Sequence, residues 1–441
     1  MINRAARRGG LVALAAITAL TVVTGCTSSA SSNQSHTGDG TGTIEIWSHQ
    51  GQTAEVTALT AAVDSFNASQ SKVKANLRIL PSDTYTQTIQ STPTNKLPDV
   101  MDIDSPTLAS FVFNEKLLPL AGVISQATVS NATGGSIAEG TYQDKLYGLA
   151  QFDSGLGLLG NKKILNAASV TIPTSIDQAW TADQFADVLK KVAGVSPSGK
   201  AIDIREANLS GEWGIYAFSP IIYAAGGSIL KNGKASGALD SSDSVKAFKE
   251  FASWKPFVAS SPGGTAFANG QVGLFWAGHG QYAAASKVLG SDVVALPLPN
   301  LGKGTKADAG SWTWSVGAGT KNSKAAGTFL DYLLNDTNVS AMVAANGAPP
   351  ATKSAFATDP LYQSGGALAL WGKQLANACS SDKVTSDCIA VYRPLTPGYP
   401  TVTAKFASAL AAVYGGADPQ TELTNAAKAI DANFADNDNY K

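Results

Sequence analysis

Hydrophobic residues recur along this chain with two different spacings. Segments in which every second residue is apolar alternate with segments in which every third or fourth is apolar, and this predicts alternating strands and helices. Residues 44–47 have the pattern of a short strand, and a polar turn follows at 48–51. Over 73–79 apolar and polar residues alternate, as in a half-buried strand. Between these strands, apolar residues recur every three or four positions and predict one face of a helix, at Val56, Leu59, Val63 and Phe66. This succession is that of an α/β protein.

Later segments continue the pattern. Residues 98–103 predict a short buried strand, and apolar residues at helical spacing predict helices over 326–333 and 402–413. Thr181 and Gln184 have the spacing of a capping box, in which each side chain bonds the other residue's backbone at the start of a helix. Because ligand sites in parallel α/β sheets lie at the carboxyl ends of the strands, we expect the site at such strand ends.

Two tryptophans lie two residues apart in the segment AGSWTWSVGAG, which spans 309–319. In an extended strand residues i and i+2 point to the same face, so Trp312 and Trp314 are expected to face one way. Their indoles either pack in a core or form a flat apolar platform for a ligand. The pattern leaves both interpretations open.

Length and composition restrict the class of protein. A chain of 441 residues exceeds one ordinary core and suggests two domains or lobes. Hydrophobic residues make up 44%, which is enough for real cores, while charged residues make up only 15% and the formal net charge is −1. A nucleic-acid partner requires concentrated lysine and arginine, so we expect none.

The N-terminus has the features of an export signal. Three arginines in the first ten residues precede an apolar run at 11–23, which is too short to span a bilayer comfortably. The run ends in Val-Thr-Gly-Cys, which resembles the lipobox of bacterial lipoproteins and predicts that lipid is attached to Cys26. We therefore predict a lipoprotein signal peptide at 1–25. The alternative is an ordinary signal peptide with an incidental cysteine.

A polar segment follows the predicted signal peptide. Residues 26–42 are rich in serine, glycine and threonine and have no apolar face, so we expect a flexible tether. Removal of 1–25 takes away three of the 32 Lys and Arg, and the net charge becomes 29 − 33 = −4. Lipid on Cys26 would anchor the protein to a membrane surface without spanning it. No later segment of the sequence is long and apolar enough for a transmembrane helix.

The other two cysteines, Cys379 and Cys388, lie nine residues apart in a polar segment. Outside the cytoplasm this arrangement favours a local disulfide. Zinc is the alternative, and it is disfavoured because no histidine is near and the chain has only three.

Motifs for catalysis are weak. GLGLLG at 155–160 fits the glycine pattern of dinucleotide-binding loops, but its leucines continue a strand where that motif requires a loop that opens a helix. The sequence has no G-x-S-x-G elbow, Walker loop or H-E-x-x-H segment. Two distant carboxylates of a glycosidase leave no local signature, so that class stays open.

From Thr43 to the C-terminus, segments in consistent order carry a resemblance to a known family. They are GTIEIWSHQ, KLPDVMDIDSPTLASF, KLYGLAQFDSGLGLLGNKKIL, WGIYAFSPIIYAAGGSIL, AFANGQVGLFWAGHG, GSWTWSVGAGTKNSKAAGTFLDYLL and RPLTPGYPTVTAKFASALAAVYGGADPQTEL. Together they resemble the family 1 extracellular solute-binding proteins of ABC importers, the sugar-binding group related to maltose-binding protein.

The resemblance implies a two-lobed, type II periplasmic-binding-protein-like α/β fold. Each lobe would have a mixed, mostly parallel sheet flanked by helices, with a hinge between the lobes. Lobe one would comprise 43–152 and 296–355, and lobe two 153–295 and 356–441. A ligand would bind in the cleft between them, and no cofactor or metal is expected.

The resemblance also implies which aromatic residues face the cleft. Trp312 matches a cleft aromatic, while Trp314 is as consistent with the core as with the cleft. Tyr216 and Phe218 match cleft positions of lobe two, although aromatics on an apolar helix often belong to a core. Trp276 lies in FWAGHG, a segment that the family brings to the cleft, and is the more core-like residue of that segment.

Polar cleft residues follow from the same comparison. Asp153 at the lobe crossing is the first candidate acceptor for sugar hydroxyls, with a hinge-turn cap as its alternative role. Asp104 follows the strand at 98–103 and is similarly placed, whereas the side that Asp102 faces is open. Arg393 would close the far rim or serve as a structural ion-pair partner. Further candidates are Ser48, His49, Gln50, His279 and Tyr399.

The function implied is a lipid-anchored, monomeric component of an ABC importer on the extracytoplasmic face of the cell membrane. It would capture a mono- to oligosaccharide and deliver it to the transmembrane permease subunits without chemical change. Three alternatives remain: a non-sugar solute such as a polyol-phosphate, polyamine or peptide, a secreted carbohydrate-active enzyme, and a surface lipoprotein that has no cleft ligand.

Overall fold

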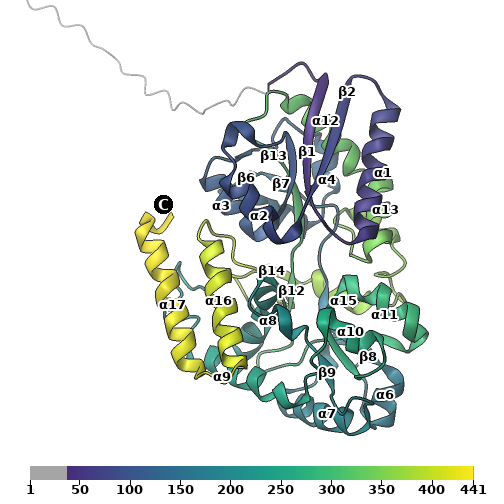
Figure 1. The fold of residues 1–441 in the computed structure, drawn as a ribbon, viewed down its shortest axis with the longest axis vertical. Helices are drawn as coiled ribbons and strands as arrows, with labels where there is room; N and C mark the ends of the chain where they lie inside the picture. Colours follow the sequence, from purple (N-terminus) through teal and green to yellow (C-terminus); the bar gives the residue numbers. More distant parts are fainter. Residues whose placement is uncertain (1–36, 441) are drawn as a thin grey trace, which may run out of the picture. The chain divides into compact units, whose positions relative to one another are not determined.

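The computed structural model describes residues 37–440 (Figure 1). The predicted signal peptide at 1–25, the lipidation site Cys26 and the tether up to residue 36 lie outside the described residues, so these expectations stay predictions.

A six-stranded mixed sheet organises one part of the molecule, drawn in purple, blue and green at the top of Figure 1. Five strands follow one another in the order β2-β1-β3-β13-β4, and β7 also pairs with β13. The first three run parallel, and β13 runs antiparallel to β3, β4 and β7. The strands are β1 Gly42–His49, β2 Val73–Leu80, β3 Val100–Asp104, β4 Leu117–Leu118, β7 Gly148–Leu149 and β13 Trp312–Gly317.

Helices bury the apolar residues of this sheet in two cores. The predicted helical stripes are confirmed in α1 (Thr53–Ser69) and α12 (Ser323–Leu333), which with α13 (Asp336–Asn346) pack against one set of strand residues. The other core contains residues of α2 (Ser82–Ser91) and α3 (Leu108–Phe113). The strands predicted at 44–47, 73–79 and 98–103 are likewise confirmed, as β1, β2 and β3.

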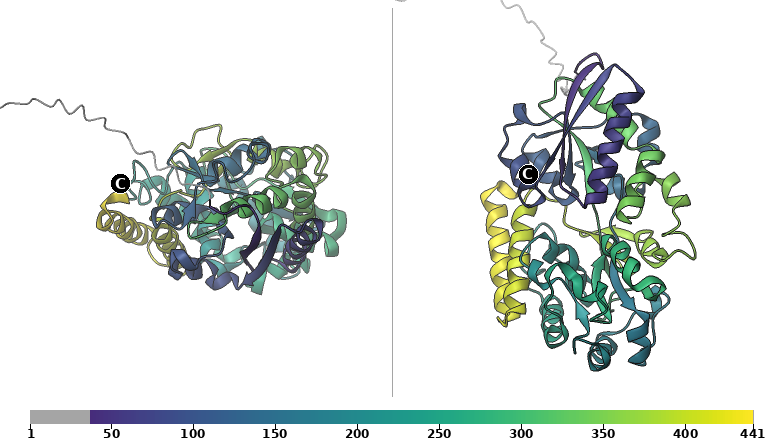
Figure 2. Two further views of the ribbon diagram at one scale, coloured as in Figure 1. Left: turned by 90° about the horizontal axis from the view of Figure 1, so that it is seen from above. Right: turned by 45° about the vertical axis from the view of Figure 1, so that its right-hand side comes forward.

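A four-stranded sheet, in the order β11-β8-β10-β9, organises the part drawn in teal. Its strands are β8 Leu156–Asn161, β9 Ile202–Asp203, β10 Leu274–Gly278 and β11 Val293–Leu296. One core beside it contains residues of α7, α8, α9, α16 and α17, and the other contains residues of α10, α11 and α15. In both Figure 1 and Figure 2, α16 and α17 lie side by side along one edge.

The GLGLLG segment is a buried strand, as the sequence predicts, and not a nucleotide-binding loop. It forms β8, in which every residue is buried. Its glycines make room for a tryptophan, since a Cβ on Gly157 would lie 2.2 Å from Nε1 of Trp371. The motif therefore reflects packing.

The four-stranded sheet is mixed, as predicted, and β8 is its one reversed strand. β8 runs antiparallel to both β10 and β11, and only β9 and β10 are parallel. The reason is the path of the chain: β8 carries it away from the first sheet and β11 carries it back, so the two strands run in opposite directions.

A small parallel sheet, β12-β15-β14, completes the strands, and an antiparallel pair joins β5 to β6. Cys379 in β14 forms a disulfide with Cys388, which confirms the predicted pairing. The residue limits of the two lobes stay a prediction. The strands are β5 Thr141–Tyr142, β6 Lys145–Leu146, β12 Ala307–Ala309, β14 Ala378–Ser380 and β15 Ala390–Tyr392.

The remaining helices cover these sheets and their connections. None of the helices within 37–440 has the length and apolar character needed to cross a membrane. They are α4 Gln126–Asn131, α5 Gly134–Gly140, α6 Lys162–Ala167, α7 Ala182–Val195, α8 Glu212–Ala225, α9 Ser242–Ser253, α10 Thr265–Ala268, α11 Tyr282–Leu289, α14 Lys353–Thr358, α15 Ala369–Leu375, α16 Tyr399–Tyr414 and α17 Pro419–Asp436.

The capping box at the start of α7 allows a stability prediction. Gln184 donates its backbone N–H to Oγ1 of Thr181 (3.3 Å), and Thr181 donates its own N–H to Oε1 of Gln184 (2.9 Å). We expect Thr181→Ala to lower the free energy of unfolding by about 1 kcal/mol, because it leaves the backbone N–H of Gln184 without an acceptor. Urea denaturation measures the change. Thr60→Ala, on the exposed face of α1, is the matched control and should lower stability little or not at all. Equal losses in both variants would contradict the assignment.

Candidate functional site

A cavity of about 320 Å³, called here the cleft cavity, lies where strand ends of the two larger sheets meet. His49 and Asp104 are the last residues of β1 and β3, and Gly278 is the last residue of β10. Trp312 opens β13, which is antiparallel to β3, so its register places Trp312 opposite Asp104. All four line the cavity, which therefore lies at the carboxyl ends of β1, β3 and β10, where we expect a site.

Two stacked rings form an aromatic surface on this cavity. The imidazole of His49 lies on the indole of Trp312, with ring centroids 3.7 Å apart and planes 11° from parallel. Tyr85 supports the same indole at a tilt, at 5.7 Å between centroids. Trp312 is only partly buried and lines the cavity, so part of its indole is open to a ligand.

A buried carboxylate sets the position of His49. Asp102 accepts hydrogen bonds from Oγ of Ser48 (2.7 Å) and from the backbone N–H of His49 (3.0 Å), and its Oδ2 lies 2.8 Å from Nδ1 of His49. Burial alone would lower the pKa of His49, but the charge and hydrogen bond of Asp102 outweigh it and raise the pKa above 6.5. Asp102 therefore faces the site side of β3, holding the imidazole that stacks on Trp312.

The first turns of α8 supply another wall. Glu212, Trp213 and Tyr216 line the cavity from this helix. The guanidinium of Arg205 lies over the ring of Trp213, 4.4 Å from its centroid. Arg205 has φ 55°, a left-handed backbone conformation that is unfavourable for a residue with a side chain and that is often found at functional sites.

One buried arginine links these two walls. Arg393 pairs with Oε1 of Glu212 at 2.7 Å through Nη1 and with Oδ1 of Asp104 at 3.4 Å through Nη2. Its Nε lies 3.7 Å from Oδ1 of Asp308, and its guanidinium lies 5.3 Å from the centroid of Tyr216. Burial raises the pKa of Asp104 to about 6, against the opposing effect of Arg393. Arg393 thus has both of the roles that the sequence left open: it lines the cavity and it is a structural ion-pair partner.

A third set of residues closes the rim. His279 and Gln281 come from the turn after β10, and Gln52 and Glu55 come from the start of α1. The two sides approach closely, since a Cβ on Gly280 would lie 2.7 Å from Nε2 of Gln52. Burial lowers the pKa of His279 to about 4, so this ring is neutral at physiological pH.

Asp153 is not in the cleft cavity, which corrects the leading carboxylate prediction. It is buried, and it accepts hydrogen bonds from the backbone N–H groups of Ser154 (2.7 Å) and Gly310 (3.0 Å) and from the hydroxyl of Tyr392 (3.0 Å). Its two oxygens are therefore committed to three chain segments that meet here. Asp153 therefore has the alternative role, that of a cap for the turn at the predicted lobe crossing.

Four predicted ligand contacts lie in the core instead. Trp276 and Phe218 are fully buried and stacked at 5.2 Å, and Nε1 of Trp276 donates to the backbone oxygen of Ala217. Trp314 is buried, and its Nε1 donates to Oε1 of Gln151 (3.2 Å). For these three residues the structure selects the core alternative, because Trp276 and Phe218 pack in the core beside the four-stranded sheet and Trp314 packs in a core of the six-stranded sheet. The fourth, Tyr399, is fully buried and donates its hydroxyl to Glu212.

Two polar predictions also lie outside the cleft cavity. Gln50 is exposed on the loop after β1 and does not line the cavity. Ser48 is buried beneath His49, where it bonds Asp102. Of the segment 48–50, only His49, the last residue of β1, lines the cavity.

The structure also brings in residues that sequence reasoning missed. Glu212 and Trp213 could have been predicted from the sequence. They lie in the first turn of a helix that follows a strand, and ligand sites of α/β proteins lie at such connections. The other missed residues carried no such signal, because their partners are distant in sequence: Gln52, Glu55, Phe152, Ser154, Arg205, Gln281, Gly310 and Ser311.

The cavity combines flat aromatic surfaces with fixed donors and acceptors. Its carboxylates from Asp104 and Glu212 are both bonded to Arg393, so they can accept hydrogen bonds from a ligand at fixed positions. In the described part of the chain, no three His, Cys, Asp or Glu side chains are grouped to hold a metal ion. The arrangement suits a polar ligand with at least one apolar face.

Comparison with known proteins gives a family of solute-binding proteins, as the resemblance in the sequence predicts. The family model described as bacterial extracellular solute-binding protein matches residues 61–369. A curated relative, an uncharacterised lipoprotein in the oleD 5′ region of Streptomyces antibioticus, is 26% identical over 320 residues, which is 68% of each chain.

Solved structures share the fold. The GacH receptor of Streptomyces glaucescens GLA.O is 20% identical, with a TM-score of 0.73 over 91% of this chain and 100% of that one. The cyclic α-maltosyl-1,6-maltose binding protein from Arthrobacter globiformis is 22% identical, with a TM-score of 0.71 over 89% and 99%. The maltose/maltodextrin-binding domain from Bdellovibrio bacteriovorus bound to maltotriose is 17% identical, with a TM-score of 0.71 over 89% and 100%. The type II two-lobed α/β fold is therefore shown.

The arginine cluster yields a stability prediction. We expect Arg393→Met to lower the free energy of unfolding by about 3–5 kcal/mol, because it leaves buried carboxylates without a counter-charge. Guanidinium denaturation measures the loss. Lys191→Met removes an exposed ion pair with Asp187 (2.8 Å) and should cost about 0.5 kcal/mol or less. A loss below 1 kcal/mol in Arg393→Met would show that the cluster is not a structural link.

The two cleft histidines are expected to titrate on opposite sides of 6.5. In an NMR titration His49 should have a pKa above 6.5 and His279 a pKa of about 4, with signals assigned through His49→Gln and His279→Gln. His49 then contributes stability that is fully present below pH 6.5 and is lost as pH rises through its folded pKa. His279 contributes stability that is present above pH 6.5 and is lost as pH falls toward 4. Two coincident titrations near 6.5 would contradict both environments.

Proposed function

We propose, since this chain belongs to the family of bacterial extracellular solute-binding proteins, that it captures a sugar in the cleft cavity and delivers it unchanged to the permease of an ABC importer. The sugar would range from a mono- to an oligosaccharide. Lipid on Cys26 would hold the protein at the extracytoplasmic face of the cell membrane.

The observation that carries the proposal is the stack of His49 on Trp312 beside charged hydrogen-bonding groups. Sugars have apolar C–H faces rimmed by hydroxyls, so an indole matches the face, and carboxylates and guanidinium groups match the rim. Asp104 and Glu212 supply charged acceptors, and Arg393 supplies donors. The 3.7 Å stack leaves the indole of Trp312 little freedom to turn away from a bound ring.

The size of the cavity agrees with a small ligand in this arrangement of the chain. Its volume of about 320 Å³ lies at the lower end of the range for small-molecule sites. Two structures of the same fold, named above, are described with acarbose and with maltotriose, and they support a carbohydrate as the ligand class.

Delivery would depend on closure of the two predicted lobes. His49, Asp104 and Trp312 come from the six-stranded sheet, while Tyr216 and His279 come from elements around the other sheet. A ligand that contacts both sets stabilises the closed state only through contacts that the open state lacks. The permease would then recognise that closed state.

The main alternative is a carbohydrate-active enzyme with the same cavity. Two carboxylates of the cleft cavity, Asp104 and Glu212, would be the candidate acid and base of such an enzyme, but both already form ion pairs with Arg393. Incubation of the purified protein with labelled oligosaccharides, followed by chromatography of the products, separates the two functions. Saturable binding without products supports the carrier, and cleavage supports the enzyme.

A substitution in the aromatic surface tests the site. We expect Trp312→Ala to weaken binding of the sugar by about tenfold or more, because it removes the platform for the sugar's apolar face. The sugar is first identified by a thermal-shift screen over a library, since a ligand of the native state raises the melting temperature. Isothermal titration calorimetry then gives the affinities.

The matched control is another indole of the same sheet. Trp47 lies on β1 beside Arg78, 5.6 Å from ring centroid to guanidinium, and does not line the cleft cavity. Trp47→Ala should leave the affinity unchanged. Unchanged affinity in Trp312→Ala, or equal weakening in both variants, would place the sugar elsewhere.

A further inference from the structure

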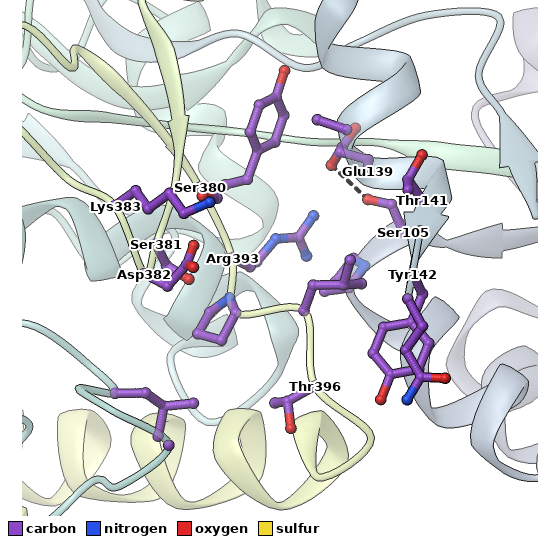
Figure 3. A pocket seen from close by; sticks show the side chains of 18 of the residues that line it. Ser105, Glu139, Thr141, Tyr142, Ser380, Ser381, Asp382, Lys383, Arg393 and Thr396 are labelled. Atoms are coloured by element: carbon purple, nitrogen blue, oxygen red, sulfur yellow. Dashed lines mark hydrogen bonds between the residues drawn. The ribbon is translucent and has the colours of Figure 1, made fainter. Parts of the chain in front are cut away.

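A second and larger cavity, of about 910 Å³, has no role in the function proposed above (Figure 3). One wall consists of Ser105 after β3, Glu139 of α5 and Tyr142 of β5. The opposite wall consists of 380–383, which starts at the last residue of β14, and of the segment 392–396. We call it the α5 cavity. Of the residues that line it, only Arg393 also lines the cleft cavity.

One buried carboxyl group of its lining is only half satisfied. Oε1 of Glu139 accepts a hydrogen bond from Oγ of Ser105 at 2.7 Å, drawn as a dashed line in Figure 3. Oε2 is buried as well and has no hydrogen-bond partner among residues 37–440. Glu139 is 7% exposed and lines the α5 cavity. An unpaired buried polar atom is unfavourable, so a ligand that bonds this oxygen gains more than it would at an exposed one.

The state of Glu139 indicates which chemical group suits it. Burial, and then the charge of Asp153, raise the pKa of Glu139 well above its usual range. A hydroxyl both donates and accepts, and it satisfies Oε2 whether or not that oxygen carries a proton. An amine or a phosphate would suit only one of the two states.

The rest of the lining points to a neutral partner. Its formal charges cancel, with three carboxylates from Glu139, Asp144 and Asp382 and three cations from Lys234, Lys383 and Arg393. Figure 3 shows hydroxyl-bearing side chains on both walls, among them Ser105, Thr141, Tyr142, Ser380, Ser381 and Thr396. The volume lies near the upper end of the range for ligand sites, and it exceeds that of the cleft cavity.

From these observations we propose that the α5 cavity is a second binding site, which takes a neutral polyhydroxylated molecule of oligosaccharide size. Its hydroxyls bond the hydroxyl and amide groups of the two walls and, after a turn of the Glu139 side chain, the free oxygen of that carboxyl group. This site is independent of the sugar proposed for the cleft cavity.

A space-filling substitution at the wall tests the site without disturbing the core. Ala138 on α5 is exposed and lines the α5 cavity, so Ala138→Trp fills it from the surface. Ala61→Trp, on the exposed face of α1 and outside both cavities, is the matched control. Glucose, maltose and maltotriose serve as probes at millimolar concentration, and native mass spectrometry with calorimetry gives the number bound.

The background of Trp312→Ala separates the two sites. We expect Trp312→Ala to keep one bound maltotriose, and the double variant Trp312→Ala with Ala138→Trp to lose it, at least tenfold in affinity. The double variant with Ala61→Trp should bind like Trp312→Ala. If Ala138→Trp and Ala61→Trp bind all three probes equally, or if Trp312→Ala binds none of them, the second site is refuted. If Trp312→Ala and the unsubstituted protein bind every probe with the same affinity and number while Ala138→Trp still loses one bound molecule, only the function proposed above is refuted.

Discussion

The arrangement of the functional site depends on one buried guanidinium. Arg393 faces Asp104 at the end of β3, Glu212 at the start of α8 and Asp308 in β12. Charges removed from water are stable only when they are paired. Because the three carboxylates belong to different elements, pairing them with one side chain holds those elements together. The cleft cavity is the space that remains in front of this cluster.

The same constraint prepares the site for a ligand. The carboxylates of Asp104 and Glu212 are held by Arg393 before any ligand arrives, so little ordering of side chains is needed on binding. Asp102 does the same for His49, and through it for the indole of Trp312. The aromatic surface and the charged rim are thus held in place before a ligand binds, by Asp102 beneath His49 and by Arg393 beside Asp104 and Glu212.

Predictions from the sequence agree with the structure for residues whose position depends on the end of their own strand. The family resemblance placed His49, Asp104 and Trp312 in the cleft, and all three line the cleft cavity because β1 and β3 end there and β13 begins there. The predictions fail where a distant partner decides. Asp153 was expected to meet the ligand, but its oxygens are taken by groups as far along the chain as the N–H of Gly310. Phe218 has the pattern of a cleft aromatic as well as that of a core residue, and packing settles it in the core.

The sequence by itself determined the α/β class, the strands and helices with strong periodicity, the capping box at Thr181, the local disulfide and the family resemblance. Each of these depends on residues that are near one another in the chain or on a pattern that runs along all of it. Only the tertiary structure decided which carboxylates share Arg393 and that Trp314 lies in the core. It also decided that Glu139, with one oxygen unpaired, lines a second cavity. Those outcomes depend on distances between segments that lie far apart in the sequence, and spacing along a chain does not encode such distances.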